Sequence, residues 1–130
     1  MSERKRFQTD RQKVAGLGSA KEGVGHWWQQ RVTAVALLPL LPLFVITFGR
    51  SLGQPLEAVQ AIYGHPFHAI VAILTIIVAV RHLQLGLQVV IEDYVHDHAL
   101  KTSALLANTL LTWALMLAGV FGVAKLAFSA

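Results

Sequence analysis

The apolar run from Phe67 to Ile91, with His82 deep inside it, constrains the fold of this chain more than any other feature. As an α-helix its roughly 25 residues would be about 37 Å long, because each residue adds ~1.5 Å. That length is enough to cross a lipid bilayer with some tilt. The run therefore predicts a transmembrane helix.

Two further apolar segments and the composition extend this prediction to the whole chain. Of the 130 residues, 55% are hydrophobic and 14% are charged, and the mean hydropathy is +0.55. Such values are typical of a small helical membrane protein. We expect an all-α integral membrane protein with one anchor unit at 26–130 and transmembrane helices at about 27–48, 67–91 and 103–128.

The segments around the spans have signals of their own. Pro39 and Pro42 predict a bend midway along the first span, because proline removes a backbone donor and clashes with the preceding turn. A short interfacial helix is expected at 56–63. A polar connection is expected over 92–102.

The positive charges are concentrated near the N-terminus. Lys and Arg next to a span mark its cytoplasmic side, so we expect the basic tail at 1–25 in the cytoplasm of a bacterium and the C-terminus in the periplasm, across the inner membrane. This explanation needs no nucleic acid. The chain has no cysteine, which excludes disulfides and cysteine-bound iron–sulfur clusters within it. Seven of the eleven basic residues precede the first uncharged segment: Arg4, Lys5, Arg6, Arg11, Lys13, Lys21 and Arg31.

The polar residues of the central span follow a helical spacing. His82 and Asp93 are eleven residues apart, and at ~100° per residue this returns to within about 20° of one direction. Gly86 follows His82 by one turn, where a missing side chain would let a flat cofactor or another helix approach. Asp93 and Tyr94 are expected about 16 Å further along the axis, near the water interface.

A histidine within a span needs a hydrogen bond, a metal or a proton path, because an unsatisfied polar group in hydrocarbon is costly. For His82 an interhelical hydrogen bond and ligation of haem iron both stay open, and a six-coordinate haem would need a second ligand from another subunit. Asp93 and Tyr94 are either an interfacial anchor or a quinone site, in which a phenol donates to a carbonyl and a carboxylate relays protons.

Three other polar positions have simpler explanations. Trp27 and Trp28 are typical of an interfacial aromatic belt. Arg31 either extends to the lipid head groups or pairs with an anionic cofactor group. His65 and His68 are three residues apart, but no third ligand follows at a useful spacing, which favours histidines without a ligand role.

Two segments resemble a known family. The segment HLQLGLQVVIEDYV at 82–95, and His26-Trp27 followed by Arg31-Val-Thr-Ala, are similar to the D-type hydrophobic membrane-anchor subunit of bacterial succinate dehydrogenase, respiratory complex II. The resemblance covers nearly the whole chain after Gly25. It implies electron transfer from succinate to ubiquinone in the tricarboxylic acid cycle and respiratory chain, with no activity expected of this chain alone.

The resemblance also implies roles and partners. His82 would be one axial ligand of haem b, Gly86 would contact the haem, and Arg31 would pair with a haem propionate or line the quinone entrance. Tyr94 would donate a hydrogen bond to ubiquinone, and Asp93 would tune the same pocket. A flavoprotein subunit and an iron–sulfur subunit would hold the flavin and the clusters, and a second cytochrome b anchor subunit would supply the other haem ligand.

One residue departs from the expected pattern, and two alternatives follow. Arg81 is an unusual charge directly before His82, about 100° around the helix from it, and could meet a haem propionate or a partner's carboxylate.

The first alternative function is the cytochrome b anchor of a fumarate reductase, in which electrons run the other way. The second is a non-redox membrane subunit that uses His82 and Arg81 for proton or ion movement.

Overall fold

The computed structural model describes residues 9–11 and 23–129, so most of the basic tail predicted at 1–25 lies outside the described residues. Every regular element in the described ranges is helical, which confirms the all-α prediction. Three helices are long and apolar enough to cross a membrane, and each contains one predicted span. The helices are α2 (Gly23–Ser51), α3 (Leu56–Gly64), α4 (Pro66–Tyr94) and α5 (His98–Phe128).

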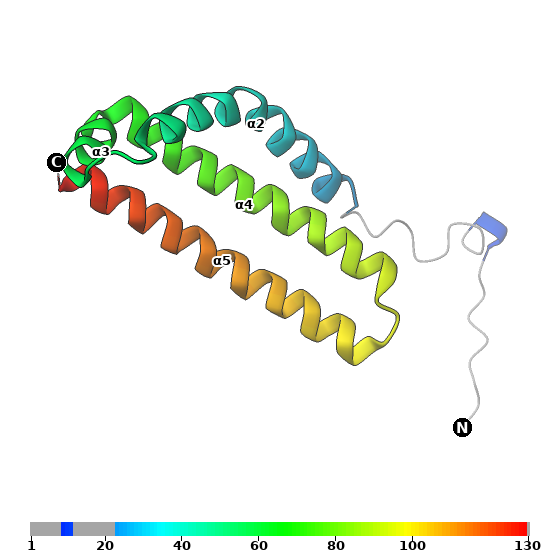
Figure 1. The fold of residues 1–130 in the computed structure, drawn as a ribbon. Helices are drawn as coiled ribbons and strands as arrows, with labels where there is room; N and C mark the ends of the chain where they lie inside the picture. The colour runs from blue at the N-terminus through cyan, green and yellow to red at the C-terminus, as the bar shows by residue number, and fades with distance from the viewer. Residues whose placement is uncertain (1–8, 12–22, 130) are drawn as a thin grey trace.

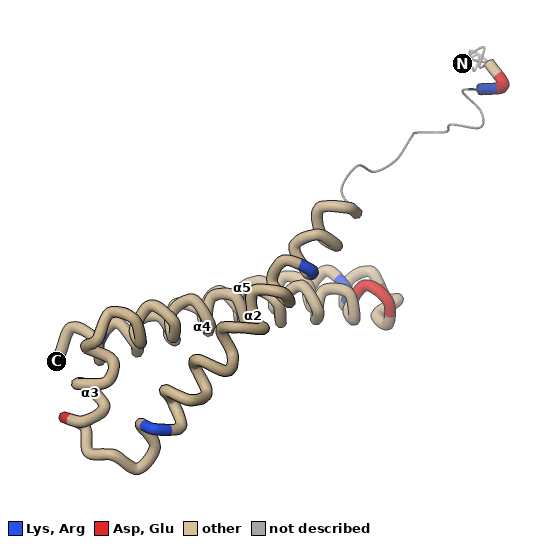
Figure 2. Tube along the Cα trace, turned by 90° about the horizontal axis from the view of Figure 1, so that it is seen from above, with Lys and Arg blue, Asp and Glu red and all other residues tan. Residues whose placement is uncertain are grey.

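The long helices form an open layer with α4 in its middle (Figure 1). Helix α4 packs against α2 on one side and against α5 on the other, whereas these two outer helices do not pack against each other in the described structure. Figure 2 shows α2 crossing the direction of α4 and α5 at an angle, with long uncharged stretches in all three. Helix α4 therefore has a different neighbour on each side, and the three long helices form an open layer and not a closed bundle.

Burial is concentrated on the central helix. In the most apolar stretch of α4, 33% of the residues are buried, compared with 6% in α2 and in α5. Leu85 and Ala72 of α4 are each only 1% exposed. Gly119 of α5 packs so closely against α4 that a Cβ there would lie 2.9 Å from Cγ2 of Ile76. The outer faces of α2 and α5 are apolar, and many of their large side chains are exposed in the described part of the chain.

Helix α2 begins three residues before the predicted anchor unit and continues through both prolines. Figure 1 shows it as an arch beside the straighter α4, in agreement with the bend expected at Pro39 and Pro42. Near these prolines, the Thr75 hydroxyl of α4 donates to the Leu40 carbonyl of α2 at 3.4 Å. The short helix expected at 56–63 is present as α3.

The polar connection predicted over 92–102 is wrong in its length, because only three residues separate α4 from α5. The Asp97 side chain caps α5 by accepting from the Leu100 backbone N–H at 2.8 Å. Lys101 Nζ donates to the Glu92 carbonyl oxygen at 2.8 Å and so satisfies a backbone acceptor at the end of α4. Hydropathy marks where a helix leaves the membrane, but backbone hydrogen bonding and capping decide where the helix ends.

Candidate functional site

His82 is held from the neighbouring helix by a threonine. Its Nδ1 lies 2.9 Å from Oγ1 of Thr33 in α2. The Thr33 hydroxyl is also within donating distance of two carbonyls of its own helix, at 2.9 Å from Gln29 and 3.1 Å from Gln30. When the single hydroxyl proton goes to one of these carbonyls, Oγ1 is left to accept a hydrogen bond from His82 Nδ1–H, and this is the tautomer considered below.

This arrangement decides which nitrogen of His82 is free. With the proton on Nδ1, the lone pair is on Nε2, and no hydrogen bond to Nε2 occurs in the described part of the chain. Ligand histidines commonly donate the opposite N–H to a fixed acceptor in this way. The interhelical hydrogen bond and the ligand role, which are alternatives from the sequence, are thus compatible in one histidine.

The space beside His82 on the α2 side is polar. Gly86 faces α2, and a Cβ placed on it would meet only Nε2 of Gln30, at 3.7 Å. Two side-chain atoms of α2, Nε2 of His26 and Oε1 of Gln30, are buried and have no hydrogen-bond partner among the described residues. Buried polar atoms without partners are uncommon in native proteins, which makes this a place where a polar group from outside the chain would be stabilised.

From the sequence alone, the residues of α2 that surround His82 received no role in the site. His26, Gln30 and Thr33 have the spacing i, i+4, i+7, which places them on one face of a helix. That spacing was a usable signal, but nothing local to α2 indicates that this face meets His82. The pairing depends on the register between α2 and α4.

Arg81 makes two hydrogen bonds to neutral amides. Its Nη1 donates to Oε1 of Gln84 at 2.8 Å, and its Nη2 donates to Oε1 of Gln29 in α2 at 2.6 Å. Gln84 is buried, and its backbone carbonyl accepts from Nδ2 of Asn108 in α5 at 3.0 Å. A chain of polar contacts therefore links all three long helices at the level of His82.

Asp93 and Tyr94 lie at the last residues of α4 and are open to the surroundings. Tyr94 is 77% exposed, and Asp93 is also exposed. Neither side chain has a hydrogen bond within the described residues, whereas Gln88 Nε2 donates to the neighbouring Glu92 at 2.8 Å. A free phenol and a free carboxylate therefore stand side by side at this end of the protein.

Arg31 is not brought to His82. It lies two residues before Thr33, about 200° around α2, and is exposed. Its guanidinium stacks over the Trp27 ring, 5.3 Å from the ring centroid. Together with Trp28 it lines a shallow hollow of about 400 Å³ on α2. The structure therefore places the Arg31 side chain on a different face of α2 from Thr33, which contacts His82.

The remaining histidine pair lies at the opposite end of the layer. His65 and His68 have ring centroids 5.3 Å apart, and Nδ1 of His68 is 3.4 Å from Oγ1 of Thr47. No group of three or more His, Cys, Asp or Glu side chains suited to a metal ion occurs among the described residues. The geometry gives these histidines no third ligand.

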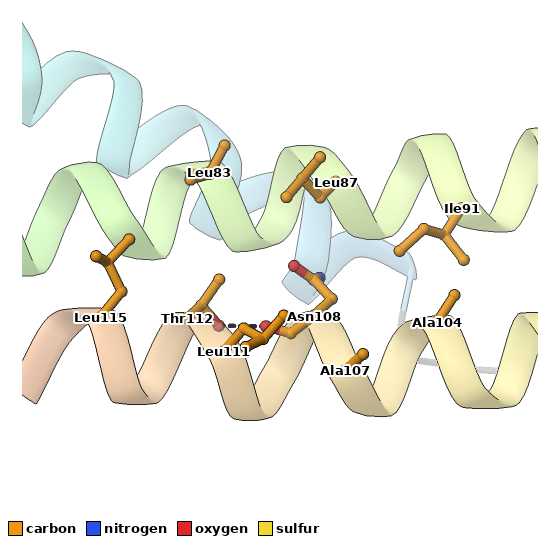
Figure 3. A pocket seen from close by; sticks show the side chains of 9 residues that line it. All are labelled: Leu83, Leu87, Ile91, Ala104, Ala107, Asn108, Leu111, Thr112 and Leu115. Carbon is orange, nitrogen blue, oxygen red and sulfur yellow. Dashed lines mark hydrogen bonds between the residues drawn. The ribbon is translucent and has the colours of Figure 1, made fainter.

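A groove of about 420 Å³ lies on the other side of α4, between α4 and α5 (Figure 3). Its lining is apolar apart from Asn108 and Thr112. Thr112 donates to the Asn108 carbonyl at 2.6 Å, and Asn108 Nδ2 is bonded to Gln84. The Asn108 Oδ1 atom is buried and has no hydrogen-bond partner among the described residues. The groove therefore offers mainly apolar contact.

The fold and the site together define a three-span helical membrane protein whose central helix presents a histidine with one free ring nitrogen. The chain belongs to the family of succinate dehydrogenase/fumarate reductase transmembrane subunits, whose family model matches residues 3–123. The resemblance seen at 82–95 is thereby confirmed.

Individual relatives agree with this family. The succinate dehydrogenase hydrophobic membrane anchor subunit of Paracoccus denitrificans is 37% identical over 125 residues, which cover 96% of each chain. The subunit of the same name from Rickettsia bellii is 34% identical over 104 residues, covering 78% of this chain and 81% of the relative. The succinate dehydrogenase membrane anchor subunit of Reclinomonas americana is 31% identical over 81 residues, covering 58% and 66%. No solved structure matches the chain.

Proposed function

We propose that this membrane anchor of succinate dehydrogenase co-ligates haem b through His82 and helps to form the ubiquinone-reduction site through Tyr94 and Asp93. The observation that supports the haem role is the Thr33–His82 contact at 2.9 Å, which leaves Nε2 of His82 as a free ligand atom beside Gly86. The second axial ligand would come from a second cytochrome b anchor subunit.

The residues of this chain fit that cofactor. Bound haem would supply a one-electron redox centre inside the membrane. Thr33 fixes the tautomer and the ring orientation of His82, and the missing side chain of Gly86 leaves room beside the ligand atom. The unpaired His26 and Gln30 atoms would find polar partners there. Arg31 lies on a different face of α2 from Thr33, so the role proposed for it is at the quinone entrance and not beside the His82 ring.

At the end of α4, the chemistry proposed is that of quinone reduction. The Tyr94 hydroxyl would donate a hydrogen bond to a ubiquinone carbonyl, and Asp93 would accept or relay a proton during reduction to the quinol. The exposure of both groups, and their lack of partners among the described residues, support this role. Succinate oxidation, flavin and iron–sulfur clusters would belong to the flavoprotein and iron–sulfur subunits.

The open layer supports assembly with a second anchor subunit. Because α2 and α5 each leave an apolar face uncovered, helices of another chain and lipid would cover these faces. We place the N-terminus in the cytoplasm and the C-terminus in the periplasm of a bacterial inner membrane, since Lys101 and the start of α2, which follows the basic segment in the sequence, lie at one end and Arg50 and Lys125 at the other. An impermeant maleimide should label Ser129→Cys in intact cells; labelling only after lysis would reverse the orientation.

The test of the haem proposal is the absorbance of the purified complex. The wild-type complex should have a b-type spectrum on reduction, and His82→Ala should lose or alter it because the iron loses an axial ligand. His68→Ala is the matched control, since His68 is also in α4 and also contacts a threonine. A spectrum unchanged in His82→Ala would refute the assignment of His82 as a ligand, and a wild-type complex without any b-type band would favour the non-redox alternative.

A further inference from the structure

Arg81 has no role in the function proposed above, although a cation inside a membrane span is costly and is usually retained for a purpose. It is the sixteenth residue of the 29-residue helix α4 and is half-buried. The α4 backbone places it about 20 Å from the last residue, Tyr94, at ~1.5 Å per residue. Extension along α4 toward Tyr94 does not cover that distance, and the guanidinium instead reaches the first turns of α2 at Gln29.

The contacts of Arg81 orient its charge without neutralising it. A guanidinium has five N–H donors, and two of its nitrogens donate to the amide oxygens of Gln84 and Gln29. An amide oxygen has no net charge to offset the cation. None of the carboxylates in the described residues forms an ion pair with Arg81. The guanidinium fork is therefore held between α2 and α4 with its charge and its remaining N–H groups unused.

The shape and charge of this arrangement indicate the missing partner. A planar guanidinium matches a carboxylate through two parallel hydrogen bonds, and such charge-assisted pairs are about twice as strong as neutral ones. The approach is open from the start of α2, because Gln29 is only about 9 Å along the axis from Gly23. The unpaired polar atoms of His26 and Gln30 lie on this same stretch of α2.

We propose that Arg81, clamped by Gln29 and Gln84, binds a carboxylate that comes from outside this chain. Two sources have this chemistry: a propionate of the haem, in which case the inference rests on the function proposed above, and an acidic side chain of a neighbouring subunit. In either case Arg81 is a binding residue and not a charged side chain without a role.

The experiment compares purified whole complexes with Arg81→Gln, Gln29→Glu and Arg50→Gln. Gln29→Glu is isosteric and places a carboxylate within the chain at the atom that Arg81 already contacts at 2.6 Å. It should therefore compete with an external carboxylate and reproduce the effect of Arg81→Gln. Arg50→Gln removes a cation at the opposite end of α2 and should behave as wild type in both readouts.

Two readouts distinguish the sources. If the haem supplies the carboxylate, Arg81→Gln and Gln29→Glu lower the haem midpoint potential in a spectroscopic redox titration, because a nearby cation favours the electron-rich reduced form. If a neighbouring subunit supplies it, both variants lose that subunit on the order of tenfold faster during detergent washes, and the potential stays unchanged.

The following outcomes would contradict the role proposed for Arg81 or the function proposed above. Wild-type values of both readouts in Arg81→Gln and Gln29→Glu would overturn the proposal. An effect of Arg81→Gln without an effect of Gln29→Glu would also overturn it, since an internal carboxylate bound to Arg81 must displace an external one. A wild-type complex without any haem band would refute the function proposed above, while the subunit-retention readout would still test Arg81.

Discussion

Replacement of Thr33 by valine tests how the structure prepares His82 for a ligand. Valine has nearly the same shape but no hydroxyl, so His82 Nδ1–H loses its acceptor at 2.9 Å. An unsatisfied donor in a half-buried site costs ~1–3 kcal/mol. Loss of an outer contact to a metal-binding histidine typically lowers metal affinity by about 10–100-fold, or ~1.4–2.7 kcal/mol. The two estimates agree, and we expect haem retention to fall by that factor.

The chain contains a matched control in Thr47→Val. Thr47 is in the same helix, and its hydroxyl donates to the Leu43 carbonyl at 3.0 Å, as that of Thr33 donates to Gln29 at 2.9 Å. Its histidine contact, to His68, is longer at 3.4 Å and lies at the opposite end of the layer. The control therefore removes the same chemical group without touching His82.

The assay is the reduced-minus-oxidised absorbance per complex over serial detergent dilutions. Thr33→Val should lose the b-type band at lower dilution than wild type, and Thr33→Ser, which keeps a hydroxyl, should stay close to wild type. Equal haem retention in Thr33→Val and Thr47→Val would contradict the idea that Thr33 sets the tautomer of His82.

Three further predictions concern helix packing, capping and the quinone end. Gly119→Ala should destabilise the protein by about 1–3 kcal/mol, because its new Cβ would lie 2.9 Å from Cγ2 of Ile76. Gly122→Ala is the control, since a Cβ there has open space around it and should not destabilise the protein. Equal thermal midpoints for the two variants would refute the predicted clash at Gly119. Asp97→Ala should cost about 0.5–2 kcal/mol through loss of the α5 cap, seen as faster hydrogen exchange in the first turn of α5, and exchange at the wild-type rate would count against it. Tyr94→Phe should slow succinate-to-ubiquinone turnover while succinate oxidation with an artificial acceptor persists; an equal loss of both activities would point to damage elsewhere.

The quinone proposal and the haem proposal are separable by these measurements. Tyr94 is about 18 Å along α4 from His82 at ~1.5 Å per residue, so a change at one should leave the other intact. A haem spectrum that is unchanged in Tyr94→Phe, together with slow quinone reduction, would agree with two distinct sites on one helix.

The amino-acid sequence by itself determined the class of protein and the residues of α4. Apolar length is a local property, so three membrane spans follow from composition along the chain. Helical spacing is local as well, so it placed His82, Gly86 and Asp93 on one helix before any neighbour was known. The short helix at 56–63 and the bend at the prolines followed from local signals in the same way.

Only the tertiary structure decided what these residues meet. The register between α2 and α4 brings Thr33 to His82, so that Nδ1 of His82 has a partner and Nε2 has none among the described residues. The same register places Gln29 against Arg81, so that the guanidinium donates to a neutral amide and not to a carboxylate. It also sets Arg31 on the other face of α2, away from His82. These contacts join residues about fifty positions apart, and no local pattern encodes them, because they arise from the packing of one whole helix surface against another.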